Sequence, residues 1–357
     1  MGSTITRKTS DHAVLTGASG LLDVSGAPAP LAVRLLDWQP EAPPISHGRA
    51  PSISAPLPRG LAELEALEGA GAAVVRVTGP DRESWIQGVQ TADVRRVPVG
   101  GAAPTLFLNT RGRALCDGTL WRLGDELRIR VPRSEQEALL AHLEHHLIME
   151  DAELSTAPGL RALRLSPGGA QELLGRLSPA QRERFAGLRG AATPLGFELL
   201  LDAPLAGELL AALPERPDPQ ALELHRLALG VPRWSVDFDA DSTPLEAGLD
   251  AQIAFDKGCY VGQEVIAMAT YRGRVPWNLV RLEVAGPAPA AGTPLDVARG
   301  GKGKVTSSAA AGDRALLLGL VHREKIEPGS ELALPDGRTA TVLGLPFGSL
   351  PGAGKRS

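Results

Sequence analysis

The chain contains few residues of the types that mark disulfide-rich, metal-binding or aromatic-rich proteins. Its 357 residues include two cysteines, Cys116 and Cys259, and only 4% aromatic residues. Two thiols cannot form a disulfide framework, and no C-x-x-C spacing is present to hold zinc or an iron–sulfur cluster. We therefore expect a reduced, cytoplasmic protein whose core consists mainly of Leu, Val and Ala.

The chain also lacks a basic excess and a long apolar segment. It has 37 Lys and Arg against 41 Asp and Glu, which gives a net charge of −4. A protein whose whole surface binds nucleic acid needs a basic field, so we expect no nucleic-acid partner. No apolar run is long enough to span a bilayer, and the first residues lack the apolar region of a secretory signal. We therefore expect no membrane partner.

Composition and periodicity divide the chain into three regions. Residues 1–60 are rich in Pro, Ala, Ser and Gly, which predicts a disordered low-complexity extension. Residues 61–275 repeat a strand–helix–strand–helix pattern, which predicts an α+β region of two similar halves divided near residue 155. Residues 276–357 contain five short strand-like segments separated by Gly and Pro, which predict a small β-barrel domain.

Apolar spacing also predicts individual elements in the first half. Residues 105–108 and 114–121 are typical of strands joined by a hairpin at 109–112. Residues 134–148 are predicted to form a helix, since their leucines recur with helical spacing. These leucines are Leu139, Leu140, Leu143 and Leu147.

Scarce residue types gather in one segment, residues 256–264. Only six lysines occur, and Lys257 is the only one between positions 9 and 301. Both tyrosines, Tyr260 and Tyr271, lie within fifteen residues of it, and Cys259 lies between Lys257 and Tyr260. The segment reads D-K-G-C-Y-V-G-Q-E.

The pattern of this segment predicts a turn followed by a helix. Gly258 and Gly262 permit a tight turn or a close backbone approach. Residues 262–270 are predicted to be helical, with Gln263 and Glu264 in the first turn, where the helix dipole favours a carboxylate.

Cys259 is the candidate functional thiol of this segment. It is expected to lie just before a helix N-terminus and beside Lys257, and both features lower a thiol pKa and raise its reactivity. The alternative interpretation is a glycine turn that contains a small buried thiol, and the residue types alone leave both open.

Residues 257–264 resemble the K-G-C-Y-x-G-Q-E signature of the YgfZ family. Those proteins are folate-binding relatives of the glycine cleavage T-protein, an aminomethyltransferase, and assist iron–sulfur cluster assembly or repair. The following Y-R-G at 271–273 also fits the family pattern. Three further blocks agree in order, at residues 79–94, 108–113 and 226–232. The resemblance runs from about residue 70 to about residue 285, continues weakly to the end of the chain, and does not include residues 1–60.

The resemblance implies a duplicated folate-binding α+β domain followed by a C-terminal β-barrel. It implies tetrahydrofolate or a derivative as cofactor, iron–sulfur client or assembly proteins as partners, and a monomer. A single thiol cannot hold a cluster alone, so transient ligation with a partner and a redox role both stay open for Cys259. The candidate folate-binding residues are Lys257, Gly258, Tyr260, Gly262, Gln263, Glu264, Arg226, Glu246, Arg272 and Arg274.

Two departures from the family pattern affect the expected chemistry. T-proteins carry a paired acid on the strand after the hairpin, whereas this chain has Cys116 and Asp117 there. The family's A-R after the signature is Ala267-Met268. An accessory protein for iron–sulfur assembly is therefore favoured over the alternative, a folate-dependent aminomethyltransferase that uses Asp117. A folate-binding module without chemistry is the third interpretation.

Three other motifs have ordinary structural interpretations. The histidines at 142, 145 and 146 have helical spacing, but a third metal ligand and its supporting groups cannot be named, which favours a solvated helix face. The Gly-Lys segment 300–304 lacks phosphate-loop spacing and is typical of a hairpin loop. The acids at 237, 239 and 241 lack the glycine and glutamate of a calcium loop, which favours a polar loop that rims a folate pocket with Glu246.

Overall fold

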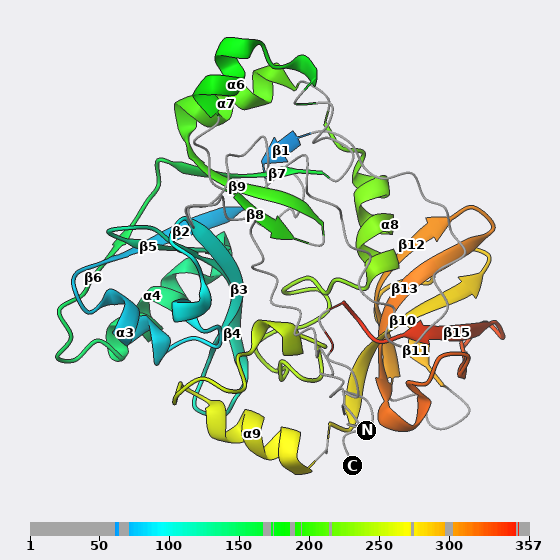
Figure 1. The fold of residues 1–357 in the computed structure, drawn as a ribbon. Helices are drawn as coiled ribbons and strands as arrows, with labels where there is room; N and C mark the ends of the chain where they lie inside the picture. The colour runs from blue at the N-terminus through cyan, green and yellow to red at the C-terminus, as the bar shows by residue number, and fades with distance from the viewer. Residues whose placement is uncertain are drawn as a thin grey trace, which may run out of the picture.

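Three antiparallel sheets organise the part of the chain that the structure describes (Figure 1). The computed structural model describes residues 61–63, 71–166, 173, 175–185, 190–193, 195–213, 216–272, 275–296, 303–347 and 349. The extension expected at residues 1–60 therefore lies outside the described residues. Figure 1 shows the first sheet on the left, the second at the top and the C-terminal sheet on the right.

The first sheet has five strands and is covered by two helices. Its strand order is β3 (Gly101–Leu108), β4 (Ala114–Arg122), β5 (Leu127–Pro132), β2 (Ala72–Thr78) and β6 (Glu153–Thr156). Helices α3 (Arg82–Gln87) and α4 (Gln136–His145) bury Trp85, Ile86, Leu139 and Leu143 against this sheet. The hairpin predicted at 109–112 joins β3 to β4. Its turn is closed by a hydrogen bond from Gly112 N to Asn109 O at 2.9 Å.

The helix predicted at 134–148 is shorter than its pattern indicated. A 3-10 turn, η2 (Arg133–Glu135), precedes α4, which ends at His145. After it, Ile148 and Met149 are 82% and 92% exposed, and their amides donate to Glu150 Oε2. The carboxylate thus satisfies amides that a continuing helix would have bonded internally.

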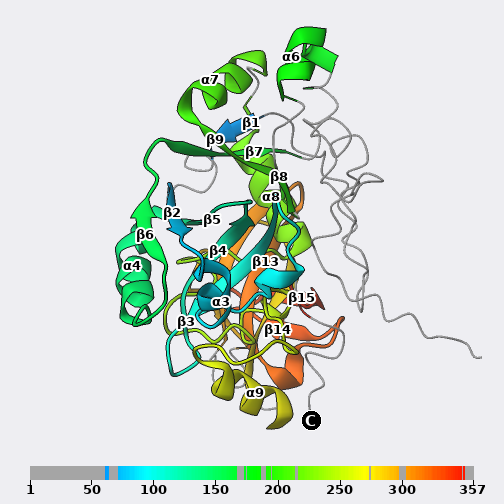
Figure 2. The same cartoon turned by 60° about the vertical axis from the view of Figure 1, so that its left-hand side comes forward.

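The second sheet has four strands in the order β1 (Leu61–Glu63), β7 (Leu160–Leu165), β9 (Gly196–Asp202) and β8 (Gly190–Thr193). Helix α7 (Ala203–Ala212) packs on it, and α6 (Pro179–Phe185) lies beside α7 in both views (Figures 1 and 2). A buried ion pair joins this sheet to the first one. Arg130 Nε and Nη2 of β5 each donate to Glu198 of β9 at 3.1 Å.

The C-terminal sheet is barrel-like, as predicted, and has six strands where the sequence pattern indicated five. Its order is β11 (Pro294–Leu295), β12 (Gly303–Ala311), β13 (Arg314–His322), β10 (Trp277–Ala285), β15 (Thr339–Gly344) and β14 (Glu331–Ala333). Its interior is filled by alternating aliphatic side chains of these strands. Helix α8 (Pro219–Leu229) packs against β12 and β13.

Helix α9 (Gln263–Arg272) lies at the opposite end of the molecule from α6 and α7 in both views (Figures 1 and 2). The α+β class with a C-terminal barrel is thus confirmed. None of the helices in the described ranges has both the length and the apolarity to cross a bilayer.

Candidate functional site

The signature segment lies along the loop that follows α3. Two backbone hydrogen bonds join the segments: Ala254 N donates to Thr91 O at 2.9 Å, and Val261 N donates to Gly88 O at 3.0 Å. The Thr91 hydroxyl adds a third bond, to Gln252 O at 2.7 Å. The loop between residues 254 and 261 is therefore held at both ends against residues 88–91.

Two exposed residues of this loop lie between two buried ones. Lys257 and Tyr260 are 5% and 7% exposed, whereas Gly258 and Cys259 are exposed. The thiol thus projects outward from a turn whose flanking side chains point into the protein. Cys116, in contrast, is buried in the core of the first sheet.

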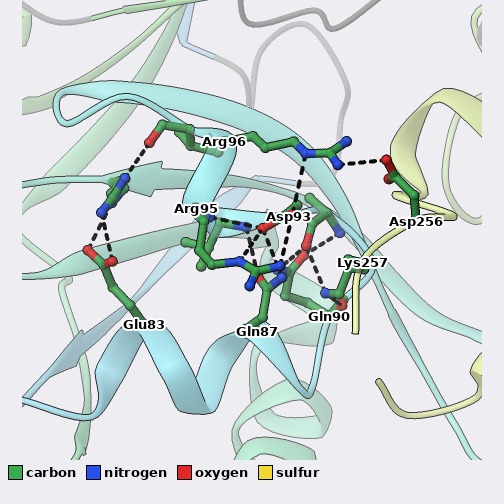
Figure 3. Close-up of polar contacts among 12 residues, drawn as sticks. Glu83, Gln87, Gln90, Asp93, Arg95, Arg96, Asp256 and Lys257 are labelled. Atoms are coloured by element: carbon green, nitrogen blue, oxygen red, sulfur yellow. Dashed lines mark hydrogen bonds and ion pairs between the residues drawn. The ribbon is translucent and has the colours of Figure 1, made fainter. Parts of the chain in front are cut away.

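Lys257 connects the loop to the protein interior. Its Nζ donates to Gln90 O at 2.6 Å and to Ala92 O at 2.8 Å (Figure 3). It also lies 5.0 Å from the centroid of the Tyr260 ring. Burial lowers the pKa of Lys257 to about 7, and the nearby charge of Asp93 opposes this shift. The amine is thus directed at backbone carbonyls, although Lys257 is only two residues from Cys259.

The two glycines of the signature have different structural roles. Gly262 has a φ of +81°, and a Cβ there would lie 2.7 Å from Asn109 O and 3.2 Å from Gly112 Cα. Only glycine fits this approach to the β3–β4 hairpin. A Cβ at Gly258 would have no heavy atom within 4 Å, so close packing does not require a glycine there.

Gln263 and Glu264 open α9, as predicted. Tyr260 N donates to Gln263 Oε1 at 3.3 Å, while Gln263 N donates to Tyr260 O at 3.1 Å. Glu264 is exposed. Burial raises the pKa of Tyr260 to about 12, so its phenol stays neutral at physiological pH.

Arg226 lies in a buried ionic cluster at the C-terminal end of α8. Its guanidinium donates to both oxygens of Glu223, at 2.6 and 2.9 Å, to Asp237 Oδ2 at 2.6 Å and to Val231 O at 2.8 Å. Asp237 Oδ1 also accepts from Thr306 at 2.5 Å and from Ser307. Arg226 thus ties α8 to β12 through acceptors of the protein itself.

Glu246 is a candidate carboxylate that is partly open to solvent. Its Oε2 accepts from Thr243 N at 3.1 Å and from Thr243 Oγ1 at 2.8 Å, and lies 3.8 Å from Arg113 Nη1. The side chain is 22% exposed. Arg272 ends α9, but only its backbone is described, and Arg274 lies outside the described residues.

Asp117 lies on β4 opposite Leu106 of β3 and is half-buried. Because side chains alternate along a strand, Asp117 and Cys116 point to opposite faces of the sheet. Burial, followed by the charge of Asp117, raises the pKa of the Cys116 thiol well above its usual range. The thiol at this position is therefore a core group.

The other motifs have separate surroundings. Within the described ranges, no group of three or more His, Cys, Asp or Glu residues is placed to hold a metal ion. The rings of His142 and His146 lie 4.5 Å apart. Burial and the neighbouring histidines lower the pKa of His142 to about 4. Asp237 belongs to the buried cluster described above, and residues 300–302 lie outside the described residues.

Two contacts of the signature loop have no signal in the sequence. One is the pair of carbonyls that accept from Lys257. The other is Arg96, whose Nη2 donates to Asp256 Oδ2 at 2.6 Å (Figure 3). A carbonyl is present at every residue, and Arg96 is 160 positions from Asp256, so only the fold reveals these partners.

Comparisons with known proteins identify the class of this fold. The GCVT N-terminal domain family matches residues 67–189. The crystal structure of glycine cleavage system aminomethyltransferase T from Bartonella henselae aligns with a TM-score of 0.67 and 20% identity, and covers 82% of this chain and 87% of that chain. The chain therefore has the T-protein fold.

The chain is also similar in sequence to curated proteins. The tRNA-modifying protein YgfZ of Serratia proteamaculans (strain 568) is 28% identical over 317 residues, which is 82% of this chain and 93% of the relative. The mitochondrial iron-sulfur cluster assembly factor IBA57 is 29% identical in Mus musculus, over 62% of this chain and 67% of the relative. In Homo sapiens it is 28% identical, over 72% and 77%. The chain is therefore similar over most of its length to YgfZ and IBA57 proteins.

Proposed function

We propose that this chain is a tetrahydrofolate-binding accessory protein for iron–sulfur cluster assembly or repair, with Cys259 as its functional thiol. The relatives are named for iron–sulfur cluster assembly and for tRNA modification, which supports the broader role. The observation that supports a functional role for the thiol is its exposure. Cys259 is exposed between the buried side chains of Lys257 and Tyr260.

The residues of segment 243–252 have the chemistry that a pterin requires. A pterin edge presents N–H donors, which carboxylate and amide oxygens accept. The Glu246 carboxylate is partly exposed and oriented by Thr243. Gln252 Oε1 is buried and has no hydrogen-bond partner among the described residues. A reduced folate would supply one-carbon or redox chemistry, and these two side chains would hold its pterin edge. Arg226 would act as a structural tie.

A complementation experiment tests the thiol. A strain that lacks its own YgfZ-family gene is assayed for iron–sulfur enzyme activities and rescued with wild type, Cys259→Ser or Cys116→Ala. We expect Cys259→Ser to fold normally and fail to rescue, whereas Cys116→Ala retains rescue if its Tm stays above the growth temperature. Full rescue by Cys259→Ser would refute the functional thiol.

Calorimetry tests the cofactor. Titration with tetrahydrofolate should give 1:1 binding, weakened about tenfold or more by Glu246→Gln, since removing one charged hydrogen-bond partner costs about 1.5–3 kcal/mol. Glu331→Gln, the same change at an exposed carboxylate of strand β14, is the control. An absence of heat at saturating tetrahydrofolate would refute the folate assignment and leave the thiol test unaffected.

A further inference from the structure

The loop that carries Cys259 has a surface contact in addition to its backbone bonds. Asp256 lies three residues before the thiol and is 66% exposed at its side chain. Its Oδ2 accepts from Arg96 Nη2 at 2.6 Å (Figure 3). This hydrogen bond lowers the pKa of Asp256, which keeps its carboxylate ionised at physiological pH.

Arg96 is itself fixed by the protein. It lies in the 3-10 turn η1 (Val94–Arg96), and its Nε is 3.4 Å from Asp93 Oδ2. Asp93 is 7% exposed, and its Oδ1 accepts from Gln87 Nε2 at 2.8 Å. Arg96 thus extends from an anchored carboxylate to the Asp256 carboxylate of the signature loop.

Its neighbour Arg95 provides a contrast within the same turn. Among the described residues, the side-chain contacts of Arg95 all go to Asp93, with Nε–Oδ1 at 3.0 Å and Nη2–Oδ2 at 3.2 Å. Arg95 therefore shares the anchor of Arg96 and makes no bond to the signature loop. Comparing variants of the two arginines therefore distinguishes a local effect on η1 from an effect on the signature loop.

We propose that Arg96, acting through Asp256, is a positioning residue for the Cys259 thiol. Together with the hydrogen bonds of Lys257 to Gln90 O and Ala92 O, the Arg96–Asp256 pair holds the outward turn from the surface side. This inference deepens the proposed function and rests on it, because the position of the thiol matters only if Cys259 acts.

Hydrogen–deuterium exchange of full-length protein measures the positioning directly. Arg96→Gln should speed exchange of the amides of residues 257–260 about two- to fivefold, the factor expected when an exposed ion pair is lost. Asp256→Asn should have the same effect, and the double variant should add little to either single change. Arg95→Gln should leave these amides within experimental error of wild type.

The complementation assay connects position with function. Arg96→Gln and Asp256→Asn should lower the rescue of iron–sulfur enzyme activities with a Tm within about 2 °C of wild type, and Arg96→Lys should restore part of it. Equal effects of Arg95→Gln and Arg96→Gln on exchange, or additive effects of Arg96→Gln and Asp256→Asn, would overturn the positioning role. Full rescue by Cys259→Ser would instead overturn the proposed function, since the exchange result does not depend on it.

Discussion

Lys257 and Arg226 are both buried cations, each 5% exposed, but the protein compensates their charges differently. Arg226 meets two carboxylates, Glu223 and Asp237. Burial would lower its pKa, but these partners outweigh burial and raise it. Lys257 donates to two backbone carbonyls, and burial lowers its pKa to about 7.

The acceptors around each buried cation match the N–H donors that its side chain can offer. A guanidinium cannot lose its proton at physiological pH, so a buried one requires carboxylates. An amine that has lost its proton still has two N–H donors, and Lys257 faces two carbonyl acceptors. The Arg226 cluster is therefore a permanent ionic tie, while the Lys257 tie also suits a neutral amine.

The largest expected effect comes from removing the permanent ion. Arg226→Met should lower the free energy of unfolding by about 3–5 kcal/mol, because it leaves Asp237 buried without a cation. Urea denaturation measures this loss. Arg233→Gln is the matched control, since Arg233 pairs with Glu223 nearer the surface, and should cost less than about 1 kcal/mol. Equal costs for both variants would remove the distinction between buried and exposed partners.

The sequence was sufficient for strands with a strong aliphatic pattern. Strands β10 and β13 were predicted because their aliphatic residues recur with the spacing that fills the barrel. Strand β6 was not predicted, because it is a mostly exposed edge strand without an apolar pattern. Short edge strands derive their pairing from the neighbouring strand, which their own residues do not reveal.

The candidate site shows the same limit. Residues 257–264 are contiguous, and their composition was enough to single them out. Residue type and the family resemblance made Arg226 a candidate folate ligand, which stays a prediction, and the sequence did not reveal its ion pairs with Glu223 and Asp237. Both acids lie within eleven residues of Arg226, but spacing along the sequence does not reveal which acids pair with a given arginine.

The close approach of Gly262 to the β3–β4 hairpin provides a second test of how the Lys257 loop is held, with a smaller expected loss of stability. Gly262→Ala should cost about 1–3 kcal/mol, because its left-handed φ and the nearby Asn109 carbonyl leave no room for a Cβ. Gly258→Ala adds the same methyl group to the same loop with open space around it, and should stay within about 0.5 kcal/mol of wild type. A similar loss for both would mean that the hairpin contact does not fix the loop.

Removing the amine should cost less than removing the guanidinium. Lys257→Met takes away two hydrogen bonds, but it also removes a polar group from the interior, and Ala92 O keeps its bond from Gln90 Nε2 at 2.6 Å. We expect a loss of about 1–2 kcal/mol at pH 7 in urea denaturation. A loss as large as that of Arg226→Met would show that Lys257 is a fully charged tie.

The smallest and most selective effect is in the pH dependence of stability. The pKa of Lys257 falls from 10.5 to about 7 on folding. Between these values the unfolded chain binds a proton that the folded chain does not, so the contribution of Lys257 to stability rises with pH. It is complete above 10.5 and is lost as the pH falls towards 7.

Unfolding free energies measured from pH 7 to 9.5 should therefore rise more steeply, or fall less, in wild type than in Lys257→Met. The difference in slope cannot exceed about 1.4 kcal/mol per pH unit, the limit for one proton. Arg226→Met should instead lower the wild-type curve without changing its slope, because the guanidinium remains charged throughout this range. Parallel curves for wild type and Lys257→Met would show that the folded protein keeps Lys257 protonated, and the two buried cations would then differ only in their acceptors.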